Sequence, residues 1–182
     1  LDASLVYVGP LIHREGVPAD FGSEQCSRLI YDAVNQWKDL RLVDRFWAQD
    51  QLARVDGTPT LDDLLSIARR IRAGRLLSGE VYTWGDSVKV RGVLYDVAHG
   101  PDPVREKTVV IPRGDLALAE QRLGQLADSL MLPEPHEAAA VPGITGTRRI
   151  DAWQAYDSAH GDLASWDLEA AAAGFRAALA RD

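Results

Sequence analysis

Cysteine, basic charge and long apolar runs are all scarce in this sequence. With Cys26 as its one cysteine, the chain can form no internal disulfide and no metal site built from several thiolates. Lys and Arg number 20 against 27 Asp and Glu, for a net charge of -7. Because neutralisation of phosphates supplies most of the affinity of nucleic-acid binders, we expect neither nucleic acid nor an anionic membrane surface as a partner. No apolar run approaches the roughly 20 residues of a membrane-spanning helix.

What the sequence does contain is typical of a globular protein. Hydrophobic residues make up 46% and charged residues 26% of the 182 positions, and this length suits one domain, or a small domain with an appendage. A strand-like run begins near Leu1 with no signal-peptide pattern before it, and a helical pattern still runs near Asp182. We therefore expect the chain to be a part of a longer protein.

The first forty residues predict a strand, a helix and a second strand. Leu5–Val8 is a continuous apolar run ended by Gly9 and Pro10, a pattern typical of a strand buried on both faces of a parallel sheet. Residues 22–37 carry apolar side chains at spacings of three and four, which predicts a helix with one buried face. Residues 40–43 predict the second, short strand.

The middle of the chain predicts a helix followed by an antiparallel meander. Thr60 is a candidate N-cap with Asp63 at the reciprocal capping position, and Gly74 is expected to end this helix. The hydrophobic period then changes from helical to alternating. Strands are expected near residues 77–82, 88–94 and 107–111, with a turn over 84–87.

The order of these elements predicts an α/β domain over residues 1–132. We expect a mixed sheet of about five strands, parallel in its first half and with the antiparallel meander at one edge, closed by a helix over residues 116–130. The stretch 133–148 is rich in proline, glycine and alanine, which is the composition of a linker. Residues 149–182 then predict a helical pair, in two segments over 149–160 and 167–181.

The meander contains four patterns that are distinctive as a set. They are Leu76–Val81, a Gly85-Asp86 turn, Val88-Lys89-Val90 and Leu94–Gly100. Together they resemble the TolB-amino-terminal-like domains found in many bacterial regulators, and the opening strand and first helix are similar to the same plan. The resemblance implies an α/β domain of this kind and supplies no catalytic residues.

The helical pair contains a second pattern. Ala171, Phe175 and Ala178 have the spacing of a small-x-x-x-aromatic core, and Trp153 and Tyr156 fill matching positions in the helix before it. This resembles the start of a tetratricopeptide (TPR) repeat, whose helical pairs bury their apolar faces by stacking on neighbouring pairs. The predicted turn between the two helices is about two residues longer than that register expects.

The order of the two resemblances implies a setting and a function. It is similar to the C-terminal, often extracytoplasmic, regions of bacterial receptor-type serine/threonine kinases and of membrane-anchored transcription regulators. It implies a non-catalytic sensing or protein-interaction module of a signalling protein on the extracytoplasmic side, periplasmic or at the cell surface, with a serine/threonine-protein kinase as the parent chain. The alternative is a small-molecule-binding regulatory domain of a membrane-anchored transcription regulator.

No residue pattern predicts catalysis, a metal or a cofactor. The histidines, at positions 13, 99, 136 and 160, show no metal-ligand spacing, and Cys26 lies on the apolar face of its helix. Asp62 and Asp63 begin a helix, where capping explains both carboxylates. Nothing assembles a nucleophile, a base and a group that orients the base, so we expect no enzymatic activity in this chain.

The candidate functional residues are therefore those of a binding protein. Aromatic side chains anchor protein interfaces, so the candidate partner-binding residues are Tyr82 and Trp84 beside the turn, and Trp153, Tyr156 and Phe175 in the helical pair. We expect a protein partner, or self-association through the helical pair. A small ligand is left open, and would bind beyond the carboxyl end of the first parallel strand, near Gly9, Pro10 and residues 11–21.

Overall fold

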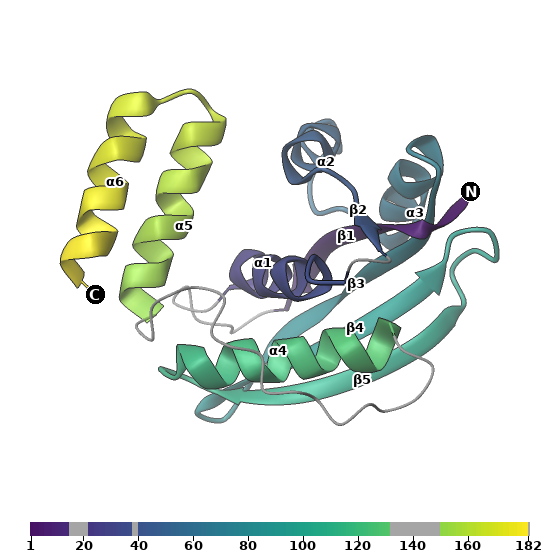
Figure 1. The fold of residues 1–182 in the computed structure, drawn as a ribbon. Coiled ribbons are helices and arrows are strands. Elements are labelled where there is room, and N and C mark those ends of the chain that lie inside the picture. Colours follow the sequence, from purple (N-terminus) through teal and green to yellow (C-terminus); the bar gives the residue numbers. More distant parts are fainter. Residues whose placement is uncertain (15–21, 38–39, 132–149, 182) are drawn as a thin grey trace.

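The computed structural model describes residues 1–14, 22–37, 40–131 and 150–181, which form an α/β domain and a helical hairpin (Figure 1). The predicted linker over residues 133–148 lies outside the described residues. The domain consists of β1 (Asp2–His13), α1 (Ser23–Val34), β2 (Arg41–Leu42), α2 (Arg45–Leu52), α3 (Leu61–Arg70), β3 (Ala73–Trp84), β4 (Ser87–Asp96), β5 (Pro103–Pro112) and α4 (Leu116–Met131), and the hairpin of α5 (Ile150–Ala164) and α6 (Leu168–Arg181).

The sheet is mixed, as the order of elements predicts. Its five strands lie in the order β2-β1-β3-β4-β5. Strand β1 pairs in parallel with β2 and with β3, because helices connect these strands, whereas β3, β4 and β5 pair antiparallel through short turns. The parallel pairs thus lie at one side of the sheet and the antiparallel meander at the other.

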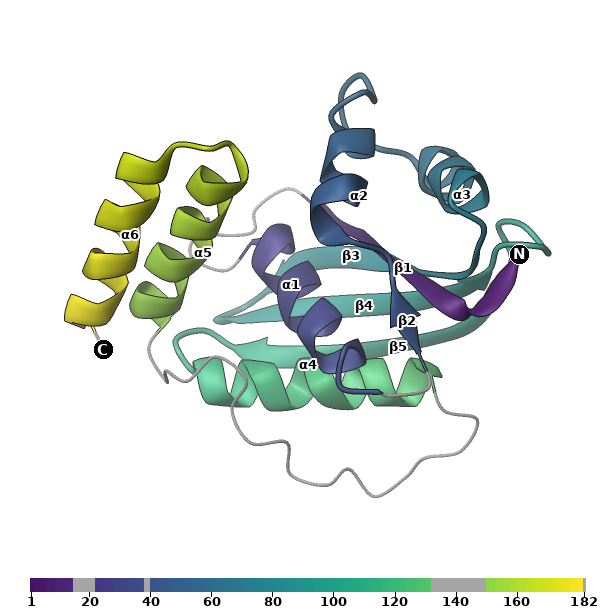
Figure 2. The ribbon, with the colours of Figure 1, turned by 45° about the horizontal axis from the view of Figure 1, so that its top comes forward.

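Helices cover the two faces of the sheet unequally. On one face α1 and α4 bury a core that extends from Val6 and Leu77 to Val90 and Ile111, so it reaches every long strand (Figure 2). On the other face α2 and α3 pack on Tyr7, Leu76 and the last part of β4. The outward side chains of β5 remain exposed on that second face.

Strand β1 continues through Gly9 and Pro10, so the prediction that these residues end it is wrong. The pairing of β1 with β3 shifts register between Val8 and Leu11. Because proline has no backbone N–H, it can sit in a strand where the ladder is interrupted. The next amide, that of Leu11, donates to Ser27 Oγ of α1 at 2.9 Å instead of to a strand.

The predicted capping of α3 is confirmed, but its predicted end is wrong. Thr60 Oγ1 accepts from the backbone N–H of Asp63, and Asp63 Oδ2 accepts from that of Thr60 at 2.9 Å. The helix ends at Arg70, and Arg72, with φ 60°, makes the reversal expected of Gly74. Gly74 instead lies in β3, where a Cβ would stand 2.5 Å from the carbonyl oxygen of Asp2.

Helix α2 occupies a stretch that the sequence patterns do not mark as helical. Asp44 caps it by accepting from the backbone N–H of Trp47 at 2.8 Å. The helix spans eight residues and buries only Ala48 and Gln51, so its apolar pattern is too short to read. Trp47 therefore lies on a helix.

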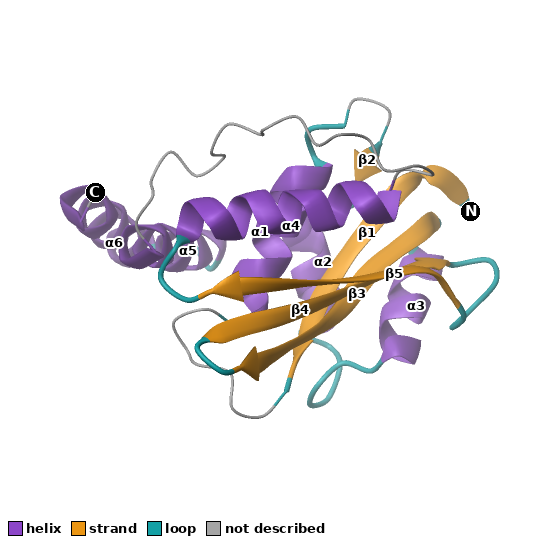
Figure 3. Ribbon diagram, turned by 90° about the horizontal axis from the view of Figure 1, so that it is seen from below, coloured by secondary structure: helices purple, strands orange, loops and turns teal. Residues whose placement is uncertain are grey.

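The helical hairpin agrees with the predicted helical pair, but the turn between its helices is shorter than predicted. Helix α5 extends to Ala164, so the turn covers only residues 165–167. Alanines at positions 152, 159, 171 and 178 are buried in this part of the chain, which lets the helices approach closely. Figure 3 shows the hairpin set apart from the sheet, beyond one end of the α/β domain.

Tyr7 carries the one buried side-chain polar atom without a hydrogen-bond partner within the described ranges. Its side chain is fully buried among the residues under α2 and α3. The same burial raises the pKa of the Tyr7 hydroxyl to about 12, because the charged form is disfavoured away from water. A buried hydroxyl without a partner loses its bonds to water and gains none in return.

We predict that Tyr7→Phe raises the free energy of unfolding by about 1 kcal/mol, since it removes that penalty and leaves the ring in place. Urea unfolding followed by circular dichroism measures the change. Tyr82→Phe, at a part-exposed tyrosine, is the matched control and is expected to change stability little. A loss of stability in Tyr7→Phe would show that the hydroxyl has a partner.

Candidate binding surfaces

One half of a sheet face carries no covering helix among the described residues. We call it the open sheet face, and its side chains come from alternate positions of β3, β4 and β5. The residues between them, such as Val81 and Val90, point into the core under α1 and α4. The open sheet face consists of Glu80, Tyr82, Trp84, Lys89, Arg91, Glu106, Thr108 and Val110.

The turn between β3 and β4 positions an aromatic group at the end of this face. Gly85 has φ 55°, a conformation that favours glycine, and Trp84 pairs with Ser87 across the turn. Tyr82 lies opposite Lys89 in the same ladder. The Lys89 ammonium stands 4.6 Å from the centre of the Trp84 ring and 5.5 Å from that of Tyr82, which are cation–π distances.

The predicted residues Tyr82 and Trp84 are therefore neighbours on one surface. Trp84 is 59% exposed, and Tyr82 is half-buried. A large aromatic side chain held by an adjacent lysine loses little freedom when a partner covers it. Lys89 was not among the predicted residues, although counting residues from the Gly85-Asp86 turn places it opposite Tyr82.

A line of ion pairs crosses the same face. The guanidinium of Arg91 donates two hydrogen bonds of 2.6 Å to the Glu106 carboxylate and lies 3.6 Å from Glu80. Arg14 pairs with Glu80 from the other side. The hydrogen bond from Arg91 lowers the pKa of Glu106, so this carboxylate stays charged. Such bidentate pairs fix side-chain directions more than they add stability at an exposed site.

The helical hairpin presents a second aromatic group. The rings of Tyr156, His160 and Phe175 lie with centres 4.8 to 5.6 Å apart, and His160 Nε2 is 2.9 Å from the Tyr156 hydroxyl. The guanidinium of Arg28, from α1, lies 5.1 Å from the Tyr156 ring centre. The structure thus brings Tyr156 and Phe175 together, and the side chain of Trp153 lies outside the described residues.

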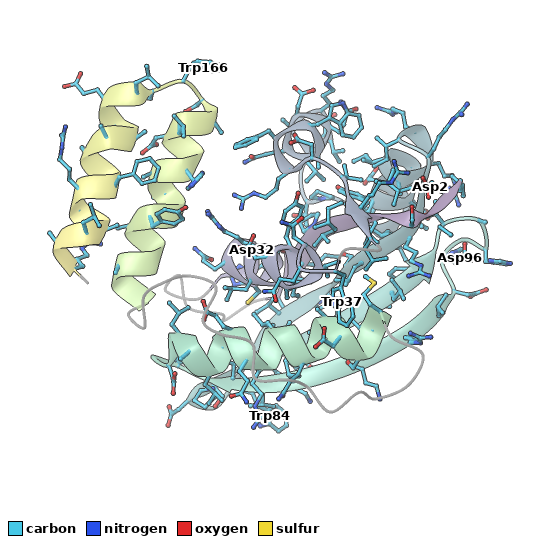
Figure 4. All side chains as sticks on the ribbon, viewed as in Figure 1. Asp2, Asp32, Trp37, Trp84, Asp96 and Trp166 are labelled. Carbon is cyan, nitrogen blue, oxygen red and sulfur yellow. The ribbon has the colours of Figure 1, made fainter. Side chains whose placement is uncertain are left out.

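These two aromatic groups do not form one surface. Figure 4 places Trp84 below the sheet and Trp166, at the tip of the hairpin, at the opposite end of the molecule. Trp166 has φ 63° and is 84% exposed, an uncommon backbone conformation for a bulky residue. The candidate residues therefore lie in two separate places, Tyr82 and Trp84 on the sheet and Tyr156 and Phe175 on the hairpin.

A cavity of about 280 Å³ lies between α1 and α2. Its floor is the irregular stretch of β1 around Gly9 and Pro10, where a ligand near the first parallel strand was expected. Arg28 and Arg45 line its walls from the two helices. Sequence patterns did not single out either arginine: Arg45 lies on α2, which was not expected, and the sequence does not show that Arg28 of α1 lies near α2.

Among the described residues, the groups that most often support catalysis or bind a metal have structural roles or lie far apart. Cys26 is fully buried in the core, and burial raises the pKa of its thiol to about 12. Because the thiolate is the reactive form, Cys26 behaves as a core residue. Asp63 is bound to the N-terminus of α3, and the described part of the chain holds no group of three His, Cys, Asp or Glu side chains placed to bind a metal. In the same ranges, every helix is too short or too polar to cross a membrane.

Comparison with known proteins gives likenesses of structure only. No family model matches the sequence, and no curated protein matches it. The LpoB C-terminal domain from Salmonella enterica is similar at 18% identity over 61% of this chain and 84% of that one, with a TM-score of 0.47. LpoB from E. coli is similar at 15% identity over 60% of this chain and 57% of that one, with a TM-score of 0.48. TolB from Acinetobacter baumannii is similar at 12% identity over 70% of this chain and 26% of that one, with a TM-score of 0.43.

We predict that alkaline pH destabilises the protein through Cys26. The folded-state pKa, about 12, lies above the ordinary value of 9.0, so the unfolded chain releases this proton first and stability falls as pH rises above about 9. In urea titrations between pH 8 and 10, wild type should lose stability faster than Cys26→Ala, with the difference in slope approaching about 1.4 kcal/mol per pH unit. Parallel pH profiles for the two proteins would contradict the assignment.

Proposed function

We propose that this chain is a non-catalytic protein-interaction module that binds its partner with the open sheet face. The observation that carries the proposal is the exposure of Trp84, at 59%, on a face with Tyr82 and Lys89 beside it. Tryptophan, tyrosine and arginine are the residues that most often dominate binding energy when a partner buries them. Here Trp84, Tyr82 and Arg91 occur together on one face.

The composition of the open sheet face favours a protein over other partners. Its apolar part, formed by Trp84 and Val110, lies beside the ion pairs of Arg91 with Glu80 and Glu106. Protein interfaces combine apolar and aromatic side chains with polar and charged ones, as this face does. The face carries both signs of charge, whereas a nucleic-acid surface is predominantly basic.

The helical hairpin is proposed to be a second interaction element, of the TPR type. Leu168 and Leu179 lie on one side of α6, about three turns apart, and are 59% and 80% exposed. Helical pairs of repeat proteins cover such a stripe by stacking on another pair. In this proposal, a second copy of the chain covers Leu168 and Leu179.

The proposal extends to the parent protein and its location in the cell. It is the sensor region of a bacterial membrane-anchored signalling protein on the extracytoplasmic side, with a receptor-type serine/threonine kinase as the parent. The support is the residue patterns at Leu76–Gly100 and Ala171–Ala178. The likeness to LpoB and TolB is one of structure and adds nothing about a kinase.

Site-specific photo-crosslinking tests the open sheet face. A benzoylphenylalanine at position 84 of the full-length protein, expressed in its own cells, is expected to give one discrete crosslinked partner. The same group at Phe46, which is 50% exposed on α2, is the matched control and should give none. The partner, once identified and purified, should bind Trp84→Ala at least about tenfold more weakly than wild type, with Phe46→Ala unchanged. Equal binding by both variants would exclude Trp84 as an anchor.

Light scattering tests the proposed self-association of the hairpin. Wild type should show a mass that rises with concentration towards that of a dimer, and Leu179→Lys should remain monomeric because a charge replaces the apolar contact. Ala173→Lys, at another exposed position of α6, is the control and should behave as wild type. A monomeric wild type at every concentration would contradict this part of the proposal and leave the open sheet face unaffected.

A further inference from the structure

The ion pairs that cross the open sheet face are close to neutral as a set. Arg91 pairs with Glu80 and with Glu106. Arg14 pairs with Glu80 from the other side, so two positive side chains balance two negative ones. The charge that a partner meets at the β3–β4 turn is therefore set by the residues between these ion pairs and the turn. We call this part the turn end of the face, and it consists of Tyr82, Trp84, Lys89 and Val110.

Lys89 is a cation of the turn end without a carboxylate beside it. In the part of the chain that the structure describes, its ammonium forms no ion pair and no hydrogen bond, and its contacts are those with the Trp84 and Tyr82 rings. A cation–π contact uses the charge of an ammonium and leaves its N–H groups without acceptors. The three donors of Lys89 are thus available to a partner.

Arg113 places a second cation beside the same turn. Its Nη2 lies 3.4 Å from the carbonyl oxygen of Gly85, the residue after Trp84, and its backbone N–H donates to the Asp86 carbonyl. Within the described ranges, the guanidinium forms no ion pair, not even with the exposed Asp86 carboxylate. A single long hydrogen bond leaves most of the five guanidinium donors without an acceptor. The turn therefore carries Lys89 and Arg113 against one carboxylate.

We infer that the turn end binds a short acidic segment of the partner protein. This inference rests on the proposed function of the open sheet face and names the chemistry of its partner. A carboxylate of the segment binds the donors of Lys89 and Arg113, and an apolar or aromatic side chain next to it packs on Trp84. Hydrogen bonds between carboxylates and cationic side chains are stronger than those between neutral groups.

The charge of the whole chain does not oppose this local preference. The chain has a net charge of -7, but at physiological ionic strength charges more than about 8 Å apart are largely screened. A segment in contact with Trp84 therefore responds mainly to Lys89, Arg113 and Asp86. A basic segment would meet two like charges there, and an uncharged segment would cover Lys89 without replacing its bonds to water.

The small number of cations favours a peptide over larger anions. Basic clusters that bind anionic membranes contain about four to eight Lys and Arg residues, and nucleic-acid binders neutralise several phosphates in a row. The turn end and Arg113 together supply two cations, beside an exposed tryptophan. One or two carboxylates with an apolar neighbour match this arrangement.

Selection from a phage-displayed library of random dodecapeptides, on the immobilised full chain, tests the inference. Peptides that wild type selects and Trp84→Ala does not are those that bind at the turn end. We expect them to be enriched in Asp and Glu next to large apolar or aromatic residues. Enrichment of basic or uncharged peptides, or no difference between the two selections, would overturn the inference.

Charge variants then assign the binding to the two cations. Lys89→Gln combined with Arg113→Gln should weaken binding of a selected peptide at least about tenfold, whereas Lys89→Arg, which keeps the charge, should bind nearly as wild type. Arg122→Gln, at an exposed arginine of α4, is the matched control and should leave affinity unchanged. Circular dichroism checks that each variant is folded. Wild-type affinity in the double variant would overturn the inference.

The partner found by crosslinking at position 84 separates this inference from the proposed function. If that partner binds Trp84→Ala weakly but binds the double variant of Lys89 and Arg113 as well as wild type, the open sheet face is the binding surface and the acidic segment is wrong. If both variants bind the partner weakly, both proposals are supported. If both variants bind it as wild type does, both are overturned.

Discussion

Parallel strands must be covered on both faces, and this constraint determines where the helices pack on the sheet. Parallel strands bury both faces, whereas an antiparallel meander can leave one face in water. Strands β1 and β3 accordingly lie between α1 on one side and α2 with α3 on the other. On the meander, α2 and α3 cover the second face only at the last part of β4, around Val93 and Tyr95. They do not cover the end of the meander at the β3–β4 turn, where Trp84 and Lys89 lie.

The same arrangement creates the cavity. Helices α1 and α2 flank β1 but meet the strand where Gly9 and Pro10 interrupt its ladder. Two serine side chains form the hydrogen bonds that the backbone of β1 does not make with a neighbouring strand there. Ser27 Oγ accepts from the Leu11 amide, and Ser78 Oγ donates to the Pro10 carbonyl. The space that remains lies on the side of α1 that also meets Tyr156 of the hairpin through Arg28. The two parts of the chain thus touch beside the cavity, away from the open sheet face.

Sequence patterns predicted the elements whose signals are local and periodic. The Thr60–Asp63 cap, the Gly85-Asp86 turn and the apolar run at Leu5–Val8 all depend on neighbours in the chain, and each occurs in the structure. Helix α2 was not predicted because eight residues carry too little periodicity. Gly74 was misread because its role, a close approach to the Asp2 carbonyl, depends on a strand seventy residues away in sequence.

The candidate site was predictable to a similar extent. Aromatic residues beside a turn pointed to Tyr82 and Trp84, and the turn itself fixes which residues of β4 oppose them. The ion pairs of Arg91 with Glu80 and Glu106 require the register of three strands. The pairing of Arg28 with Arg45 around one cavity requires the packing of two helices on β1, which no local pattern encodes.

Hydroxyl-radical footprinting, on the purified protein and inside its own cells, tests the central claim most directly. The side chains of Trp84 and Val110 are exposed on the free protein and that of Tyr82 is half-buried, so oxidation in the purified sample should be fast at Trp84 and measurable at all three. If a partner occupies the open sheet face, oxidation of these three residues should fall together in cells, while that of Phe46 on α2 stays the same. Equal oxidation of Trp84 in the two samples, with protection elsewhere, would contradict the account.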